Sequence, residues 1–170
     1  MTNIFIDTNI VNLILDIDVE NSNDFTYEED RYYMKEILKV VAKDNRFRLY
    51  VNPTVKQEID ACPDSKRRDS LLNIFNDLNL TSFNLTILPF VLPATLISEE
   101  QAKMIDDLCR ENTGLKKDKK IIADSAFCKE IDILLTADRK HLADKNLKIG
   151  SLKICTPKKL HEYLSNTFHE

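Results

Sequence analysis

The first apolar run of the chain, Ile4-Phe5-Ile6, ends abruptly at Asp7. Its apolar residues are consecutive rather than alternating, which is typical of a strand that is buried on both faces of a parallel sheet. The next segment, TNIVNLILD (8–16), has the apolar spacing of a helix. A buried strand that leads directly into a helix is the building unit of an α/β fold, and it restricts this chain more than any other feature of its sequence.

The same alternation of strands and helices continues along the chain. Residues 18–30 are polar and are predicted to form a loop. The further predicted strands or extended segments are 47–53, 82–90, 131–138 and 151–157, and the further predicted helices are 28–44, 54–62, 64–79, 97–112, 116–130 and 157–166. No internal repeat divides the 170 residues. The chain is therefore predicted to form a single α/β domain at 1–166, with a mainly parallel central sheet flanked by helices, followed by a disordered tail at 167–170.

The composition excludes several classes of function. The chain has only 2 glycines and no glycine-rich phosphate-binding motif, which argues against the common nucleotide-binding folds. Its 4 cysteines are widely spaced, so a zinc cluster is not expected and the thiols are predicted to be reduced. A net charge of −4 does not fit a general nucleic-acid coat, but an acidic metal site can lie among local basic patches. We expect a cytoplasmic protein without a membrane segment.

Two predicted strands end in the same way, one on Asp7 and the other on Asp138 in ILLTAD. Each aspartate could simply cap the helix that follows it. Sites in open parallel sheets, however, gather at the carboxyl ends of strands near a reversal of strand order. If the two strands are neighbours, Asp7 and Asp138 come together at such an edge.

Further acids lie on helices that start near the same edge. Glu58 is on the helix after the second strand, and Asp118 opens the helix that leads into ILLTAD. Asp118 shares a helix face with Ile122 and Ser125, whereas Asp124 lies about 240° round the helix from Asp118. Position favours Asp118 as the inward acid, and Asp124 reaches the site if the helix is tilted or starts later.

Converging carboxylates repel one another, so they either raise each other's pKa or hold a cation. Hard oxygen ligands select Mg²⁺ or Mn²⁺. Such a metal lowers the pKa of a bound water and stabilises the transferring phosphoryl group. The acids therefore predict a metal-dependent nuclease.

Several segments resemble the PIN-domain ribonucleases, a family that includes VapC-like nucleases. They are IFIDTNI, TVKQEI, DKKIIADSA, LLTADRKHL and TPKKLHEYL, and together they extend from Asp7 to about Leu164. The resemblance implies a PIN-like fold and endonucleolytic cleavage of RNA. It also implies that the protein is either the toxin of a toxin–antitoxin pair, with an antitoxin as partner, or an RNA-processing enzyme. Separately, the apolar, proline-rich stretch TILPFVLPATLI (86–97) is either a surface for a homodimer or another partner, or part of the core.

The resemblance also assigns roles to individual residues. It implies that Asn9 supports Asp7 by hydrogen bonding and that the Thr136 hydroxyl lies beside the metal site, facing Asp138 or a water. The implied ligands of Mg²⁺ or Mn²⁺ are Asp7, Glu58, Asp118 and Asp138, with Asp124 as the alternative or additional acid.

Basic residues flank the predicted acids and could contact RNA phosphates. The candidates are Lys119, Lys120, Arg139 and Lys140, of which the last two directly follow Asp138. Such clusters are otherwise solvated surface. The alternative function is a PIN-like module that binds RNA or protein without cutting it. A phosphotransfer domain with Asp7 as nucleophile is a weaker third interpretation, because the D-x-D pattern is absent.

Overall fold

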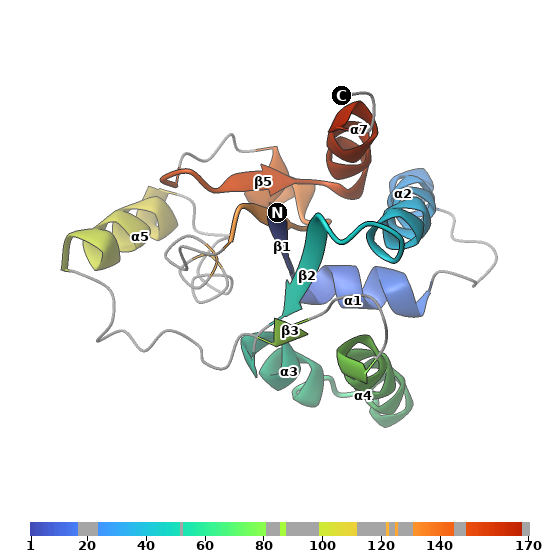
Figure 1. Ribbon diagram of the computed structural model, residues 1–170. Helices are drawn as coiled ribbons and strands as arrows, with labels where there is room; N and C mark the ends of the chain where they lie inside the picture. Colours follow the sequence, from blue (N-terminus) through green and yellow to red (C-terminus); the bar gives the residue numbers. More distant parts are fainter. Residues whose placement is uncertain are drawn as a thin grey trace.

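The computed structural model describes residues 1–16, 24–51, 53–80, 86–87, 99–111, 122, 125, 131–144 and 149–167. Its centre is a sheet of five strands in the order β3-β2-β1-β4-β5 (Figure 1). Every pairing in this sheet is parallel. The strands are β1 (Thr2–Ile6), β2 (Phe47–Val51), β3 (Thr86–Ile87), β4 (Ile133–Leu135) and β5 (Lys153–Cys155). The predicted α/β class with a parallel sheet is therefore confirmed.

Helices cover the sheet. In Figure 1, α1, α2 and α7 lie on one side of the strands and α5 lies on the other. A short π-helical turn, η3, directly follows the end of β4. The bounds are α1 (Thr8–Leu15), α2 (Phe25–Val41), α3 (Pro53–Asp60), α4 (Ser65–Leu80), α5 (Glu99–Glu111), η3 (Arg139–Ala143) and α7 (Pro157–Thr167). Within the described ranges, no helix combines the length and the apolar character needed to cross a membrane.

The core is centred on β1. Ile4, Phe5 and Ile6 are all 0% exposed, as expected for a strand covered on both faces. Apolar side chains from β2, β4, α1, α2 and α7 join them in one cluster. This packing fixes the position of the residue that follows β1, which is Asp7.

The predicted loop at 18–30 is wrong from Phe25 onwards, because α2 begins there. The reason is a local cap: the Asp24 side chain accepts hydrogen bonds from the backbone N–H groups of Thr26 and Tyr27, at 2.9 and 3.3 Å. At the other end of the chain, α7 includes Thr167, one residue beyond the predicted domain boundary. The rest of the predicted tail lies outside the described residues, as does most of the predicted helix at 116–130.

The end of α1 is tied to its neighbours by a polar cluster around Asp16. Its carboxylate accepts hydrogen bonds from the Tyr27 hydroxyl on α2 and from the Arg67 guanidinium on α4, the latter at 3.0 Å. Burial alone would raise the pKa of Asp16, but the hydrogen bonds from Tyr27 and Arg67 and the charge of Arg67 outweigh it, so the pKa lies below its ordinary value of 3.8. Burial and the nearby Asp16 carboxylate raise the pKa of Tyr27 to about 12.

This cluster predicts an acid-dependent loss of stability. Because the Asp16 pKa is lower in the folded than in the unfolded state, the unfolded chain takes up the proton first as the pH falls. Wild type is thus expected to be more stable than Asp16→Asn near neutral pH, and the difference should shrink as the pH falls below about 4, the ordinary pKa of an aspartate. Urea unfolding of both proteins between about pH 3 and 7 measures this difference. Asp69→Asn, at an exposed carboxylate on α4, is the control and should follow wild type at every pH.

Candidate active site

The strand order places a reversal beside β1. From β1 the chain builds outward through β2 to β3 on one side, and β4 and β5 complete the sheet on the other. The carboxyl ends of β1 and β4 therefore meet at the reversal point, where open α/β sheets hold their ligands. Ile6 is in register with Leu135, and the Asp7 N–H donates to the Leu135 carbonyl at 3.1 Å. The two strands are therefore neighbours, which is the condition on which Asp7 and Asp138 were expected to come together.

Asp7 is both a helix cap and the centre of a polar network. It is 4% exposed, and its Oδ1 accepts from the Thr8 backbone N–H at 2.6 Å, which caps α1. Its Oδ2 accepts from the Asn9 amide at 2.6 Å and from the Thr136 hydroxyl at 2.8 Å. The predicted hydrogen bond from Asn9 is therefore present, and the carboxylate of Asp7 is held from both strand ends.

The remaining hydrogen bonds of Asn9 and Thr136 fix their orientation. The Asn9 Nδ2 also donates to Thr136 Oγ1 at 3.0 Å, and the Asn9 Oδ1 accepts from the Ala137 N–H at 2.8 Å. Thr136 Oγ1 donates its one proton to Asp7 and also accepts from the Asp138 N–H at 3.0 Å. The Thr136 hydroxyl was expected to face Asp138 or a water; it does contact Asp138, through the backbone N–H, and it also donates to the Asp7 side chain.

Replacing the hydroxyl of Thr136 tests this network. Thr136→Val keeps the shape of the side chain but removes its hydroxyl. The Asn9 amide and the Asp138 N–H then lose an acceptor, and the buried Asp7 carboxylate loses a donor. We expect it to lower the free energy of unfolding by about 1–3 kcal/mol, the cost of unsatisfied buried polar groups. Thr136→Ser keeps the hydroxyl and should cost less. Urea unfolding of the three proteins decides: equal losses in Val and Ser variants would show that only packing matters there.

Glu58 and Asp138 lie around the same edge. The Thr8 hydroxyl donates to the Glu58 carboxylate, which connects α3 to the start of α1. Asp138 caps η3 by accepting from the His141 N–H at 2.9 Å, and its other oxygen is 2.9 Å from His141 Nδ1. Because an ionised carboxylate only accepts, Nδ1 carries the proton in this pair.

Sequence reasoning missed the contributions of Thr8 and His141. For His141 a local signal existed, since it lies three residues after Asp138 and so can return to it across one turn. For Thr8 the partner is 50 residues away, and no local pattern indicates it.

The third predicted acid is not placed. Asp118 and Asp124 lie outside the described residues, as do Lys119 and Lys120. Ile122 and Ser125, which share the predicted face of Asp118, are both 0% exposed. Among the described residues, no three acidic, histidine or cysteine side chains form a group that could hold a metal ion. A complete ligand set therefore stays a prediction.

The basic residues after Asp138 have different environments. Arg139 Nη2 lies 2.7 Å from Asp30 Oδ1 and 3.6 Å from Glu29 Oε2, both on α2. Two carboxylates of the same chain therefore engage its guanidinium, and a phosphate contact of Arg139 stays a prediction. Lys140 is exposed, and its phosphate contact stays a prediction.

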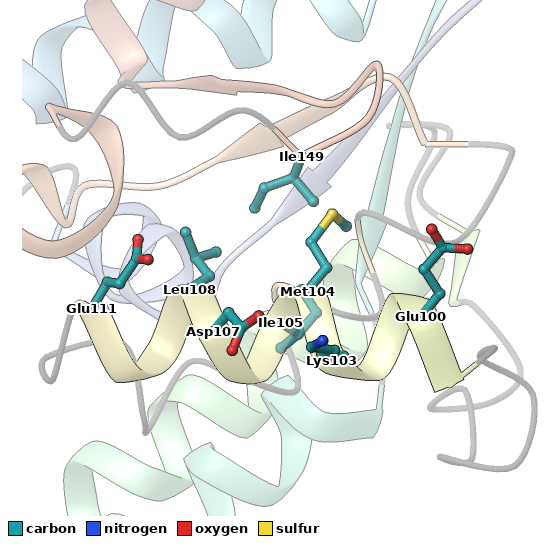
Figure 2. Close-up of a pocket in the computed structure, with 8 residues that line it drawn as sticks. All are labelled: Glu100, Lys103, Met104, Ile105, Asp107, Leu108, Glu111 and Ile149. Carbon is teal, nitrogen blue, oxygen red and sulfur yellow. The ribbon is translucent and has the colours of Figure 1, made fainter.

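A cavity of about 580 Å³ lies elsewhere, along α5 (Figure 2). Met104, Leu108 and Ile149 point toward the same space in that view. The lining residues are Glu100, Lys103, Met104, Ile105, Asp107, Leu108, Glu111 and Ile149. None of them is a predicted site residue, so this cavity is separate from the polar network at the strand ends.

The similarity of this chain to known proteins is low. No protein-family model matches the chain, and no curated protein matches it. Among solved structures, the chain is similar to a crystal structure of VapBC2 from Rickettsia felis bound to a DNA fragment from its promoter. The two are 16% identical with a TM-score of 0.49, over 91% of this chain and 98% of the other. Such a loose overlap carries no conclusion about function.

Proposed function

We propose that this protein is a metal-dependent endoribonuclease of the PIN type, which hydrolyses RNA phosphodiester bonds at the carboxyl ends of β1 and β4. One observation carries the proposal: Asp7 and Asp138 follow adjacent parallel strands at the reversal of strand order, and the Thr136 hydroxyl links them. The buried Asp7 carboxylate accepts hydrogen bonds from three donors, whereas capping α1 uses only one of its two oxygens. The hydrogen bonds to the other oxygen therefore support a second role at this edge of the sheet.

The donor chemistry fits Mg²⁺ or Mn²⁺. Asp7, Asp138 and Glu58 are carboxylates, the ligands these ions prefer, and Asp118 or Asp124 would add a further one. Among the described residues the first three do not by themselves form a metal-binding group. Carboxylates that bind metals are themselves hydrogen-bonded by outer residues, as Asp7 is by Asn9 and Thr136. When bound, such an ion supplies charge for the phosphodiester and makes a water more acidic.

The residues of the chain would then have separate tasks. Thr136 and Asn9 hold the Asp7 carboxylate in one orientation, and His141 does the same for Asp138. Thr8 holds Glu58. Lys140 is exposed two residues after Asp138 and would contact a phosphate of the RNA. A toxin or RNA-processing role and an antitoxin partner are carried over only from the PIN resemblance, and a homodimer rests only on the apolar stretch at 86–97.

One observation favours the non-catalytic alternative, a module that binds RNA or a partner protein. No complete metal-ligand group is found within the described ranges of the chain. The two functions differ in whether RNA is cut and in whether chelation abolishes the effect.

Cleavage of labelled RNA decides between these functions. Structured RNAs, including tRNA and rRNA fragments, and single-stranded DNA are incubated with wild type in Mg²⁺, in Mn²⁺ or in EDTA. We expect RNA fragments in both metals, none in EDTA, and recovery when Mn²⁺ exceeds the chelator. Asp138→Asn should lose the activity, whereas Asp144→Asn, at the exposed far end of η3, should retain it.

Two results would contradict the proposal. Cleavage that persists in EDTA would show that no divalent ion is needed. RNA binding by folded wild type, measured by gel shift, without cleavage in either metal would favour the binding module.

A further inference from the structure

A chain of charged side chains joins α2 and α7 to the turn that carries Asp138. Asp30 on α2 pairs with Arg139 at 2.7 Å, and Arg139 also lies 3.6 Å from Glu29. Glu29 in turn pairs with Lys158 of α7 at 2.9 Å. The four residues contribute two negative and two positive charges, so the chain is balanced.

Asp30 is the unusual member, because its side chain is only 3% exposed. Burial raises the pKa of Asp30, and the charge and hydrogen bond of Arg139 oppose that rise. Arg139 is 28% exposed, so it is mainly the Asp30 carboxylate that loses its hydration, and the attraction between the two charges has to offset that loss before the pair adds net stability. The position of the pair therefore points to orientation rather than to stability.

Arg139 connects this pair directly to the candidate site. It follows Asp138 in sequence and is the first residue of η3, while Asp138 caps the same turn through the His141 N–H. The turn is thus held at its start by Asp138 and from the side by Asp30. Asp30 reaches Arg139 across 109 positions in the sequence.

We propose that Asp30 is a positioning residue of the site: through Arg139 it orients η3 so that the Asp138 carboxylate stays paired with His141 beside the β1 strand end. The structural part of this inference concerns side chains in the free protein. Its catalytic consequence rests on the proposed nuclease function.

The first test needs no substrate or metal. The ¹⁵N shifts of the His141 ring report which nitrogen is protonated, and the pair with Asp138 requires the proton on Nδ1. Spectra are recorded without metal at about pH 8, where an ordinary imidazole is neutral. We expect wild type and the control Glu36→Gln, at an α2 carboxylate that pairs with Lys39 of the same helix, to show the Nδ1–H form. Asp30→Asn should shift the population toward Nε2–H.

A double variant separates positioning from stability. Asp30→Leu combined with Arg139→Met replaces the ion pair by apolar contact and should unfold close to the wild-type temperature. If Asp30 and Arg139 position Asp138, the double variant nevertheless loses the Nδ1–H form. Its kcat for RNA should fall about 10- to 100-fold, the range for outer-shell partners of metal ligands, with KM changed less than about threefold.

The outcomes are distinct. A folded double variant with the wild-type His141 spectrum and wild-type kcat would overturn the inference and leave the pair a structural contact. If the double variant does not fold, Asp30→Asn decides, and an unchanged spectrum in that variant overturns the inference as well. A spectrum that depends on Asp30 in a protein that cuts no RNA would support the positioning role and contradict only the nuclease function.

Discussion

Asp7→Asn is expected to abolish RNA cleavage, with kcat reduced by more than about 100-fold. Outer-shell partners of metal ligands already cost about 10- to 100-fold when removed, and Asp7 is proposed as a ligand itself. The variant removes the negative charge at the reversal point while its volume is nearly unchanged. Initial rates with labelled RNA in Mn²⁺ measure the effect.

The hydrogen bonds of Asp7 explain why asparagine cannot replace it. One oxygen faces the Thr8 N–H and the other faces the Asn9 amide and the Thr136 hydroxyl. An asparagine must turn its NH₂ group toward one of these donors, whichever way it is oriented. We expect a loss of about 1–3 kcal/mol in the free energy of unfolding in addition to the loss of activity.

A stability control separates the two effects of Asp7→Asn. Activity is compared at a temperature where both proteins are folded by circular dichroism. Thr136→Val, which disturbs the same network but keeps the Asp7 charge, should lose less activity than Asp7→Asn at matched stability. Cleavage at the wild-type rate by folded Asp7→Asn would exclude Asp7 as a metal ligand.

Phe5→Ala should cause the largest loss of stability, about 3–5 kcal/mol in the free energy of unfolding. Phe5 is 0% exposed in β1, which pairs with β2 on one side and β4 on the other. Truncation leaves a cavity between one face of the sheet and the residues that cover it, and the paired β1 backbone cannot move to close it. A typical domain has only about 5–15 kcal/mol in total, so the variant should unfold at much lower urea concentration.

Phe25→Ala is the matched control for Phe5→Ala. It removes the same side chain, but Phe25 is 84% exposed at the start of α2, so we expect a change within about 0.5 kcal/mol. Similar losses in the two variants would mean that β1 is not the centre of the core.

Strands and helices such as β1 and α1 can be predicted from short stretches of the sequence. The consecutive apolar residues of β1 predict a strand buried on both faces, and helical spacing predicts α1, because both patterns depend on neighbours within one or two turns. The α2 start at Phe25 was missed although its signal is also local: Asp24 is a strong N-cap residue inside a stretch that looks polar throughout. The implied hydrogen bond from Asn9 to Asp7 spans only two residues and is present.

Which strand ends lie side by side cannot be predicted from these local patterns and is known only from the strand order of the folded chain. Two strands that end on aspartate can lie anywhere in a sheet, and the pairing of β1 with β4 over more than a hundred residues follows from packing of the whole chain. The same holds for Arg139: its place after Asp138 predicts phosphate binding, but its ion pair with the buried Asp30 of α2 is known only from the fold. Strands, helices and their caps can be predicted from residues a few positions apart. The partner of a charged side chain depends instead on which distant segments the fold brings into contact.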